Sequence, residues 1–123
     1  MPKSLITSDS MTHDNLIVTG VMPYVTDKVT LLTGAAYERG TVLGIVTASG
    51  KAVKVDSSKS DGSQTPHAIL IEDTDATDAD AVATVFLTGE FNAAALKFGG
   101  ADTVATHKKA LRSLGIFAKT VQG

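Results

Sequence analysis

Histidines and acidic residues are the side chains of this sequence that could carry out acid–base chemistry. The chain has three histidines, His13, His67 and His107, and a run of carboxylates between residues 73 and 80. A general base needs an orienting carboxylate and a reactive group within hydrogen-bond reach, so His67 or His107 beside that acidic run could serve a small hydrolase or isomerase. No nucleophile motif such as G-x-S-x-G accompanies them, and no two histidines have the spacing of metal ligands on one helix face. The sequence therefore predicts no catalytic residues, and an enzyme is the less favoured hypothesis.

The segment 44–51 (GIVTASGK) resembles a phosphate-binding loop. Such a loop has four residues between its glycines and a Ser or Thr after the lysine, whose hydroxyl reaches magnesium. Here five residues separate Gly44 from Gly50, and Ala52 follows Lys51. A β-hairpin turn accounts for the same residues, so we expect no nucleotide cofactor and no other cofactor.

Asp73, Asp75, Asp78 and Asp80 offer the oxygen atoms that calcium prefers. An EF-hand loop that began at Asp73 would need Gly at its sixth position and Glu at its twelfth. The sequence has Asp78 and Thr84 at these positions. Asx-turns in a solvated connector are the favoured role for these carboxylates, and we expect no metal site.

Size, charge and composition exclude several classes of protein. The 123 residues suffice for one domain, and its core must be built from small branched side chains because aromatics make up only 5% of the chain. The net charge is −2, and the one dense basic group, Lys108, Lys109 and Arg112, has no aromatic neighbours. We interpret that group as a solvated helix end, so no nucleic-acid partner is expected. No apolar run approaches the ~20 residues of a membrane span and no signal peptide is recognisable, which predicts a cytoplasmic protein without a membrane partner.

Short runs of strand-forming residues, separated by turn residues, begin near residue 15. The predicted strands cover residues 16–19, 28–33, 41–47, 52–55, 67–72, 81–88 and 116–118. Residues 48–51 are the predicted turn of a hairpin, and Gly44 within the preceding strand indicates a bulge or a close backbone approach. Residues 73–80 are predicted to be an acidic connector.

One helix is predicted near the C-terminal end of the chain. Asp102 or Thr103 is a suitable N-cap, and Gly115 is placed to end the helix in the left-handed conformation. A shorter turn capped by Asn92 precedes it. The apolar stripe of the predicted helix consists of Val104, His107, Leu111 and Leu114.

Residues 1–14 differ from the rest because they are rich in Ser, Thr and Asp and have neither helical nor strand periodicity. We interpret them as a flexible N-terminal arm, and residues 15–123 as the folded domain. The sequence thus predicts a mainly β fold, a compact single domain of short strands and hairpins with one short C-terminal helix.

Four segments, in order along the chain, carry a resemblance to a known family. They are 30–44 (TLLTGAAYERGTVLG), 61–75 (DGSQTPHAILIEDTD), 85–96 (VFLTGEFNAAAL) and 111–119 (LRSLGIFAK). Together they resemble the head decoration proteins of lambda-type tailed phages. The resemblance implies a β-clip-like fold and a homotrimer on the outer surface of the capsid. Such a trimer would bind three-fold positions of the expanded head and cement the major capsid protein against the pressure of packaged DNA.

The same resemblance assigns the capsid contact to the N-terminal arm. In the family this region is mobile in the free protein and becomes ordered on the shell. The expected capsid-binding residues are Pro2, Lys3, Ser4, Leu5, Ile6, Thr7 and Ser8. We therefore expect a non-enzymatic virion protein that occupies the host cytoplasm during assembly. The alternatives are another structural phage module, such as a tail or baseplate component, and a small hydrolase.

Overall fold

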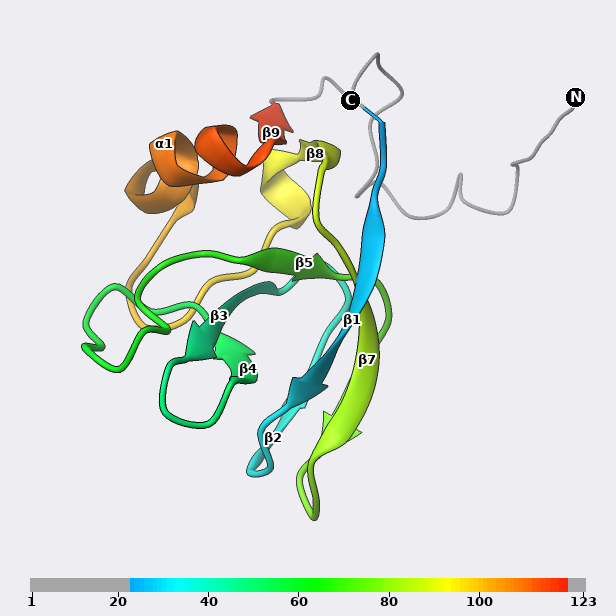
Figure 1. The fold of residues 1–123 in the computed structure, drawn as a ribbon. Coiled ribbons are helices and arrows are strands. Elements are labelled where there is room, and N and C mark those ends of the chain that lie inside the picture. The colour runs from blue at the N-terminus through cyan, green and yellow to red at the C-terminus, as the bar shows by residue number, and fades with distance from the viewer. Residues whose placement is uncertain (1–22, 120–123) are drawn as a thin grey trace, which may run out of the picture.

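The alternation of short apolar runs and turn residues produces a mainly β fold with one α-helix near its C-terminal end, as the sequence predicts. A computed structural model describes residues 23–119, which form one compact domain (Figure 1). Within this range no helix is long and apolar enough to cross a membrane. The predicted arm 1–14, its boundary with the domain and the predicted strand 16–19 lie outside the described residues.

Five strands close into a small barrel (Figure 1). They are β1 (Thr26–Leu31), β3 (Val42–Val46), β4 (Lys51–Lys54), β5 (Ala68–Leu70) and β7 (Ala81–Phe86). They pair in the order β1–β4–β3–β5–β7, and β7 returns to β1. Each neighbouring pair is antiparallel except β1 with β4. Among the described residues β1 and β4 pair only at Leu31 and Ala52, so closure on this side of the barrel is short, whereas β1 and β7 pair along their whole length.

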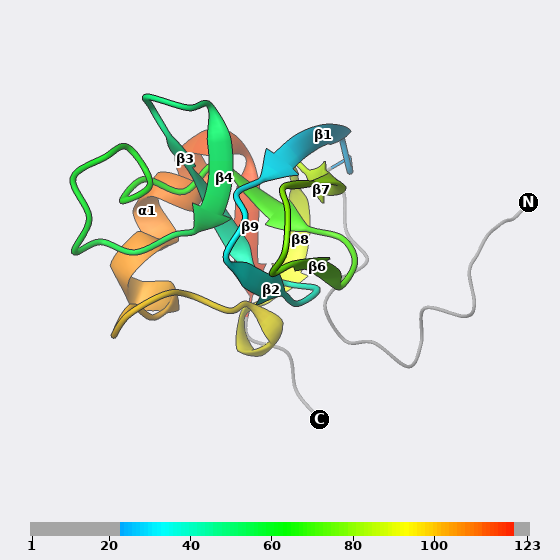
Figure 2. The same cartoon turned by 90° about the horizontal axis from the view of Figure 1, so that it is seen from below.

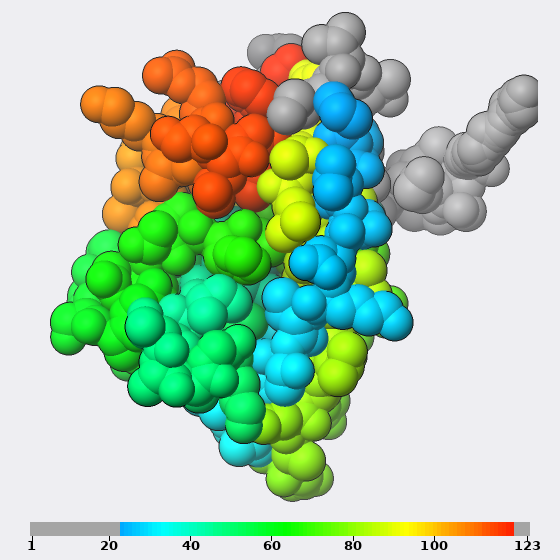
Figure 3. Space-filling view, viewed as in Figure 1, coloured from blue at the N-terminus to red at the C-terminus, as the bar shows by residue number. Residues whose placement is uncertain are grey.

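Two short two-stranded sheets extend the barrel in opposite directions (Figures 1 and 2). They are β2 (Ala35–Tyr37) with β6 (Thr74–Ala76), which is antiparallel, and β8 (Gly89–Asn92) with β9 (Ile116–Lys119), which is parallel. The 3-10 turn η2 (Ala93–Ala95) and the helix α1 (Val104–Leu114) lie at the end that carries β8 and β9. Figure 3 shows the surfaces of α1 and β9 side by side above the barrel, and we call this part of the molecule the helix end.

Two clusters of buried apolar residues hold these layers together. One fills the barrel and contains Leu31, Leu43 and Val85. The other contains Phe91 and Leu111 and lies between the barrel, the β8–β9 sheet and α1. Both clusters draw residues from strands far apart in the sequence, so the pairing of the strands and the formation of the cores depend on each other.

Three aromatic rings anchor the second cluster, although the chain has few aromatics. The ring centroid of Tyr24 lies 5.6 Å from that of Phe86 and 5.7 Å from that of Phe91, and both pairs are in edge-to-face arrangements. This geometry is favoured because the positive edge of one ring meets the negative face of another. The Tyr24 hydroxyl also donates a hydrogen bond of 2.8 Å to the carbonyl of Glu90. The segment that precedes β1 is thereby fixed against β8.

The predicted hairpin forms between β3 and β4. Its turn places Gly50 at φ +72°, a left-handed conformation that glycine adopts without strain. The register continues without interruption through Gly44, which lies opposite Val53, so Gly44 is not a bulge. It is a close backbone approach, since a Cβ atom at this position would lie 2.5 Å from the carbonyl oxygen of Ser63.

The predicted helix and its two ends are confirmed, whereas the predicted stripe is only partly correct. Thr103 is the N-cap, and Gly115 ends the helix at φ +89°. His107 and Leu111 are buried, but Leu114 is 40% exposed. The reason is that Gly115 turns the chain immediately after Leu114, and β9 then supplies the next buried side chain.

The sequence missed three strands, β2, β6 and β8. Residues 73–80 are therefore not only a connector, because Thr74–Ala76 pairs with Ala35–Tyr37. A run of three residues is too short to show a period, and its conformation is decided by the distant segment with which it pairs. The Asn92 turn is confirmed, since the Asn92 side chain accepts a hydrogen bond from the Ala94 amide at 3.1 Å.

We predict that Gly44→Ala lowers the free energy of unfolding by about 1–3 kcal/mol, because the new methyl group overpacks the contact with Ser63. Chemical denaturation followed by circular dichroism measures this loss. Gly50→Asn is the control, because no atom lies within 4 Å of that position and Asn tolerates the left-handed conformation. Equal stability of Gly44→Ala and the original protein would contradict the close approach.

Candidate functional site

The seven residues expected to bind the capsid, Pro2 to Ser8, lie outside the described residues. The residues considered for acid–base chemistry all lie within them, apart from His13. The structure does not bring His67 or His107 together with the carboxylates of residues 73–80. His67 is exposed on the side of the barrel, while His107 is 4% exposed and pairs with a different carboxylate, that of Asp102.

Carboxylates between residues 73 and 80 accept hydrogen bonds that stabilise turns. Asp75 accepts hydrogen bonds from the amide and the hydroxyl of Thr77, at 2.9 and 2.7 Å, which is the predicted Asx-turn. Asp80 accepts from the amide of Thr33 at 2.8 Å and pairs with Lys51 at 2.5 Å. Among residues 23–119, no group of three or more His, Asp or Glu is placed to hold a metal ion.

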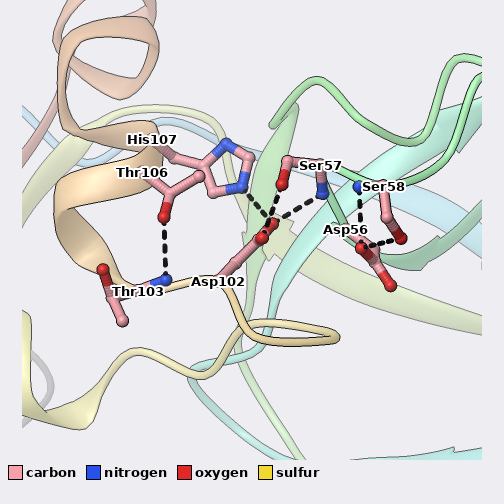
Figure 4. Close-up of polar contacts among 7 residues, drawn as sticks. All are labelled: Asp56, Ser57, Ser58, Asp102, Thr103, Thr106 and His107. Carbon is pink, nitrogen blue, oxygen red and sulfur yellow. Dashed lines mark hydrogen bonds and ion pairs between the residues drawn. The ribbon is translucent and has the colours of Figure 1, made fainter.

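The carboxylate of Asp102, whose side chain is only 6% exposed, has several hydrogen-bond partners (Figure 4). One of its oxygens, Oδ1, accepts a hydrogen bond of 2.6 Å from the Ser57 hydroxyl. The other, Oδ2, accepts from the Ser57 amide and lies 2.6 Å from Nε2 of His107. An ionised carboxylate can only accept, so Nε2 of His107 carries the proton and donates it to the contact. We call these three residues the Asp102 cluster.

The order of groups in the Asp102 cluster does not fit nucleophilic catalysis. In a catalytic triad the imidazole lies between the serine and the carboxylate, because it must take the proton from the hydroxyl. Here the Asp102 carboxylate lies between Ser57 and His107 (Figure 4). His107 therefore does not contact the Ser57 hydroxyl that it would have to activate, and its ring stacks on Phe98 with the centroids 5.6 Å apart.

The cluster instead joins the loop that follows β4 to the start of α1. The two segments approach closely, because the Gly99 amide donates a hydrogen bond of 2.8 Å to the carbonyl of Val55. A Cβ atom at Gly100 would lie 2.9 Å from the carboxylate of Asp56. Glycines and a buried carboxylate thus allow two polar loops to pack with little space between them.

Hydrogen bonds stabilise the charged forms of the carboxylates in this region. The Ser57 hydroxyl, followed by His107, lowers the pKa of Asp102 below its usual range. The pKa of Asp56 is also lowered, chiefly because its carboxylate accepts hydrogen bonds from the hydroxyl and the amide of Ser58. Both carboxylates are therefore acceptors that hold loops, and neither has the raised pKa of a general acid.

A hollow of about 500 Å³ lies beside the cluster, between η2 and the start of α1. Its lining includes Ala93, Leu96, Phe98 and Val104, together with Asp102 on the side of the cluster. Asp102 is already bonded to Ser57 and His107. The Asp102 carboxylate, the charged group in the lining of the hollow, thus stabilises the fold through these contacts.

The sequence identified only part of this cluster. It singled out His107 as a residue of the apolar stripe and Asp102 as a possible N-cap, but the N-cap is Thr103. Ser57 was not identified, because it lies 45 residues before Asp102 in a loop rich in Ser and Asp. An Asp placed just before a helix and five residues before a His is the signal that could have suggested the pairing.

The fold and the Asp102 cluster define a small β-barrel module in which Ser, Asp and His fasten segments of the chain to one another. Over residues 5–117 the sequence matches the family model of bacteriophage lambda head decoration protein D. The chain belongs to this family, which confirms the resemblance seen in the four sequence segments. No curated protein matches the chain. Membership makes the chain a phage head decoration protein, associated with the capsid of the virion.

We predict that Asp102 contributes stability that is lost in acid. Because the pKa of Asp102 is lowered in the folded state, its contribution is fully present above its unfolded value of about 3.9 and disappears as the pH falls through the folded value. The difference in the free energy of unfolding between the original protein and Asp102→Asn should therefore shrink as the pH is lowered from about 5 to about 2.

Urea denaturation at several pH values measures this difference. Asp78→Asn removes one exposed carboxylate outside the cluster and controls for the change in net charge. If the difference in the free energy of unfolding between the original protein and Asp102→Asn stays constant over the whole pH range, the charge of Asp102 does not stabilise the fold.

Proposed function

We propose that this protein binds as a homotrimer at the three-fold positions of the expanded head, on the outer surface of the capsid, and stabilises the shell against the pressure of packaged DNA. The observation that carries the proposal is the family match over residues 5–117, which covers nearly the whole chain. The match to a head protein favours this role over that of a tail or baseplate component. During assembly the protein would occupy the host cytoplasm.

Symmetry explains why a trimer suits such a position. A ligand with three-fold symmetry makes each contact with a three-fold site three times. When three modest contacts are linked, the second and third form within one complex, and the avidity rises by orders of magnitude. A protein that binds the assembled shell but not its free subunits stabilises the shell through mass action alone, by about 2.7 kcal/mol per site at a concentration one hundred times Kd.

This role requires binding and no chemistry, and we propose that the protein is not an enzyme. The Asp102 cluster supports this, because its carboxylate separates Ser57 from His107. The carboxylates of Asp75 and Asp80 support it too, since they hold Thr77, Thr33 and Lys51. The proposed partners are further copies of the chain and the major capsid protein, without nucleic acid, membrane or cofactor.

We further propose that residues 1–14 are the arm that contacts the capsid, with residues 2–8 as its contact segment, and that residues 15–123 form the decoration domain. The family match begins at Leu5, so the family pattern extends into this segment. Leu5 and Ile6, flanked by Ser4 and Thr7, are its best strand-forming segment, because Ile and Thr are enriched in strands. An extended segment that adds to an exposed sheet edge of the capsid would gain main-chain hydrogen bonds in return for its lost entropy.

The homotrimer predicts a mass in solution of three times the 12.7 kDa of the chain. Light scattering coupled to size-exclusion chromatography, over a range of concentrations, measures this mass. We expect the trimer at high concentration, with dissociation on dilution if the contacts are small. A single monomer mass at all concentrations, together with monomeric occupancy on heads, would contradict the proposal.

The proposed arm predicts that deletion of residues 2–14 weakens binding to purified expanded heads by on the order of a hundredfold, because three linked contacts are lost together. The melting temperature and the mass in solution should stay unchanged. A finer test replaces Leu5 and Ile6 with Ser, and Ser10→Ala with Thr12→Ala, outside the contact segment, is its matched control. If the deletion leaves occupancy of the heads unchanged, the capsid contact must lie on the folded domain.

A further inference from the structure

Helix α1 carries three cations and no anion. Lys108, Lys109 and Arg112 lie within Val104–Leu114, which contains no Asp or Glu. All three are exposed, and none takes part in an ion pair with another residue of the range 23–119. We call these three residues the basic face of α1. It is a concentration of positive charge in a protein whose net charge is −2.

The stability of the helix does not account for this basic face. Residues three and four positions apart are neighbours on a helix surface, so Arg112 lies next to both Lys108 and Lys109. Like charges at these spacings destabilise a helix. The repulsion that Arg112 experiences is offset because this residue lies in the last turn, where the helix dipole favours positive charge. This effect falls off within one turn and does not reach Lys108.

One group of acidic residues lies at the opposite end of the molecule, while Glu90 and Asp102 at the helix end are paired with Lys119 and His107. Figure 1 shows α1 at one end and β2, the partner of β6, at the other. The segment around β6 contains Glu72, Asp73, Asp75, Asp78 and Asp80. Charges separated in this way give the molecule a dipole, which turns its basic end toward a negatively charged surface during approach.

The chain enters the described domain at the helix end as well. The Thr88 hydroxyl donates a hydrogen bond of 2.7 Å to the carbonyl of Pro23, and Tyr24 bonds to Glu90 of β8. The described part of the chain therefore begins at the end that carries α1 and β8 (Figure 1). The basic face and this first described segment share one end of the molecule.

We propose that the basic face of α1 docks against a cluster of Asp and Glu side chains on the capsid surface, at the end of the molecule where the described chain begins. This inference rests on the proposed function and adds a second contact to it, with a partner of defined charge. A folded acidic protein surface fits better than nucleic acid, because no aromatic side chain accompanies the three cations for base stacking. The contact would orient the domain and hold it flat on the shell while the arms anchor it.

The test compares binding of Lys108→Gln/Lys109→Gln with that of the original protein on purified expanded heads. Gln has nearly the helix propensity of Lys, so the fold should be kept, and Arg112 remains to satisfy the end of the helix. Lys54→Gln/Lys59→Gln is the matched control, since it removes the same charge from exposed positions outside α1. Melting temperatures measured by circular dichroism verify that all variants are folded.

We expect the α1 variant to bind about a hundredfold more weakly at low ionic strength, because the loss of two exposed ion pairs weakens each chain's contact about fivefold and the three chains of the trimer bind together. The difference should vanish at about 1 M salt because exposed charges are then screened. Lys108→Glu/Lys109→Glu should weaken binding further, and the control variant should bind like the original protein.

Three outcomes would overturn the inference in distinguishable ways. If the original protein binds heads and the α1 variant binds equally well at low salt, the basic face is not a contact, although the proposed function stands. If the original protein does not bind heads at all, the proposed function fails and this inference fails with it. If fluorescence anisotropy shows tight binding to a DNA duplex at physiological salt that Lys108→Gln/Lys109→Gln abolishes, the partner of the basic face is nucleic acid.

Discussion

The pairing of β1 with β7 closes the barrel, and the positions of the other layers depend on it. Six residue pairs, from Thr26 with Phe86 to Leu31 with Ala81, join segments that are fifty to sixty residues apart. The pairing buries Leu31 in the barrel and extends beyond the strands, since the Leu87 amide donates to the carbonyl of Val25. It thereby brings the start of the domain against β8 and assembles the aromatic rings of the second core. Without this pairing, β1 and β7 would each expose an edge, and the helix end would lose strands against which it packs.

The loops of this protein are held by hydrogen bonds more than by apolar burial. A small chain with few aromatics has little apolar surface that its loops could bury. The Asp102 carboxylate satisfies three donors at once, and the glycines at 44, 99 and 100 let backbone segments approach where a Cβ atom would not fit. A buried carboxylate that lost these donors would remain uncompensated, so the arrangement specifies one conformation for the junction between the loop after β4 and helix α1.

The polarity of the molecule gives a physical basis for a binding role. One end carries α1, whose three cations form no ion pair within residues 23–119, and the start of the described chain, while the acidic turns around β6 lie at the other end. The family of head decoration proteins, to which the chain belongs, defines the setting as a capsid. In the proposed role the barrel would act as a platform that presents one end to the shell, and the proposed arm would supply reach that the barrel lacks.

Local sequence pattern determined the elements whose signals are contained in a few adjacent residues. The hairpin around Gly50, the turn capped by Asn92 and the helix between Thr103 and Gly115 follow from turn and capping preferences, and all three were predicted. Tertiary structure alone decided the strands β2, β6 and β8, because three or four residues become a strand only when a distant partner supplies their hydrogen bonds. It also decided that Asp102 meets Ser57 and His107, and that Gly44 touches Ser63. Spacing along the chain does not encode contacts across more than a few turns, since these are fixed by how the closed barrel brings its loops together.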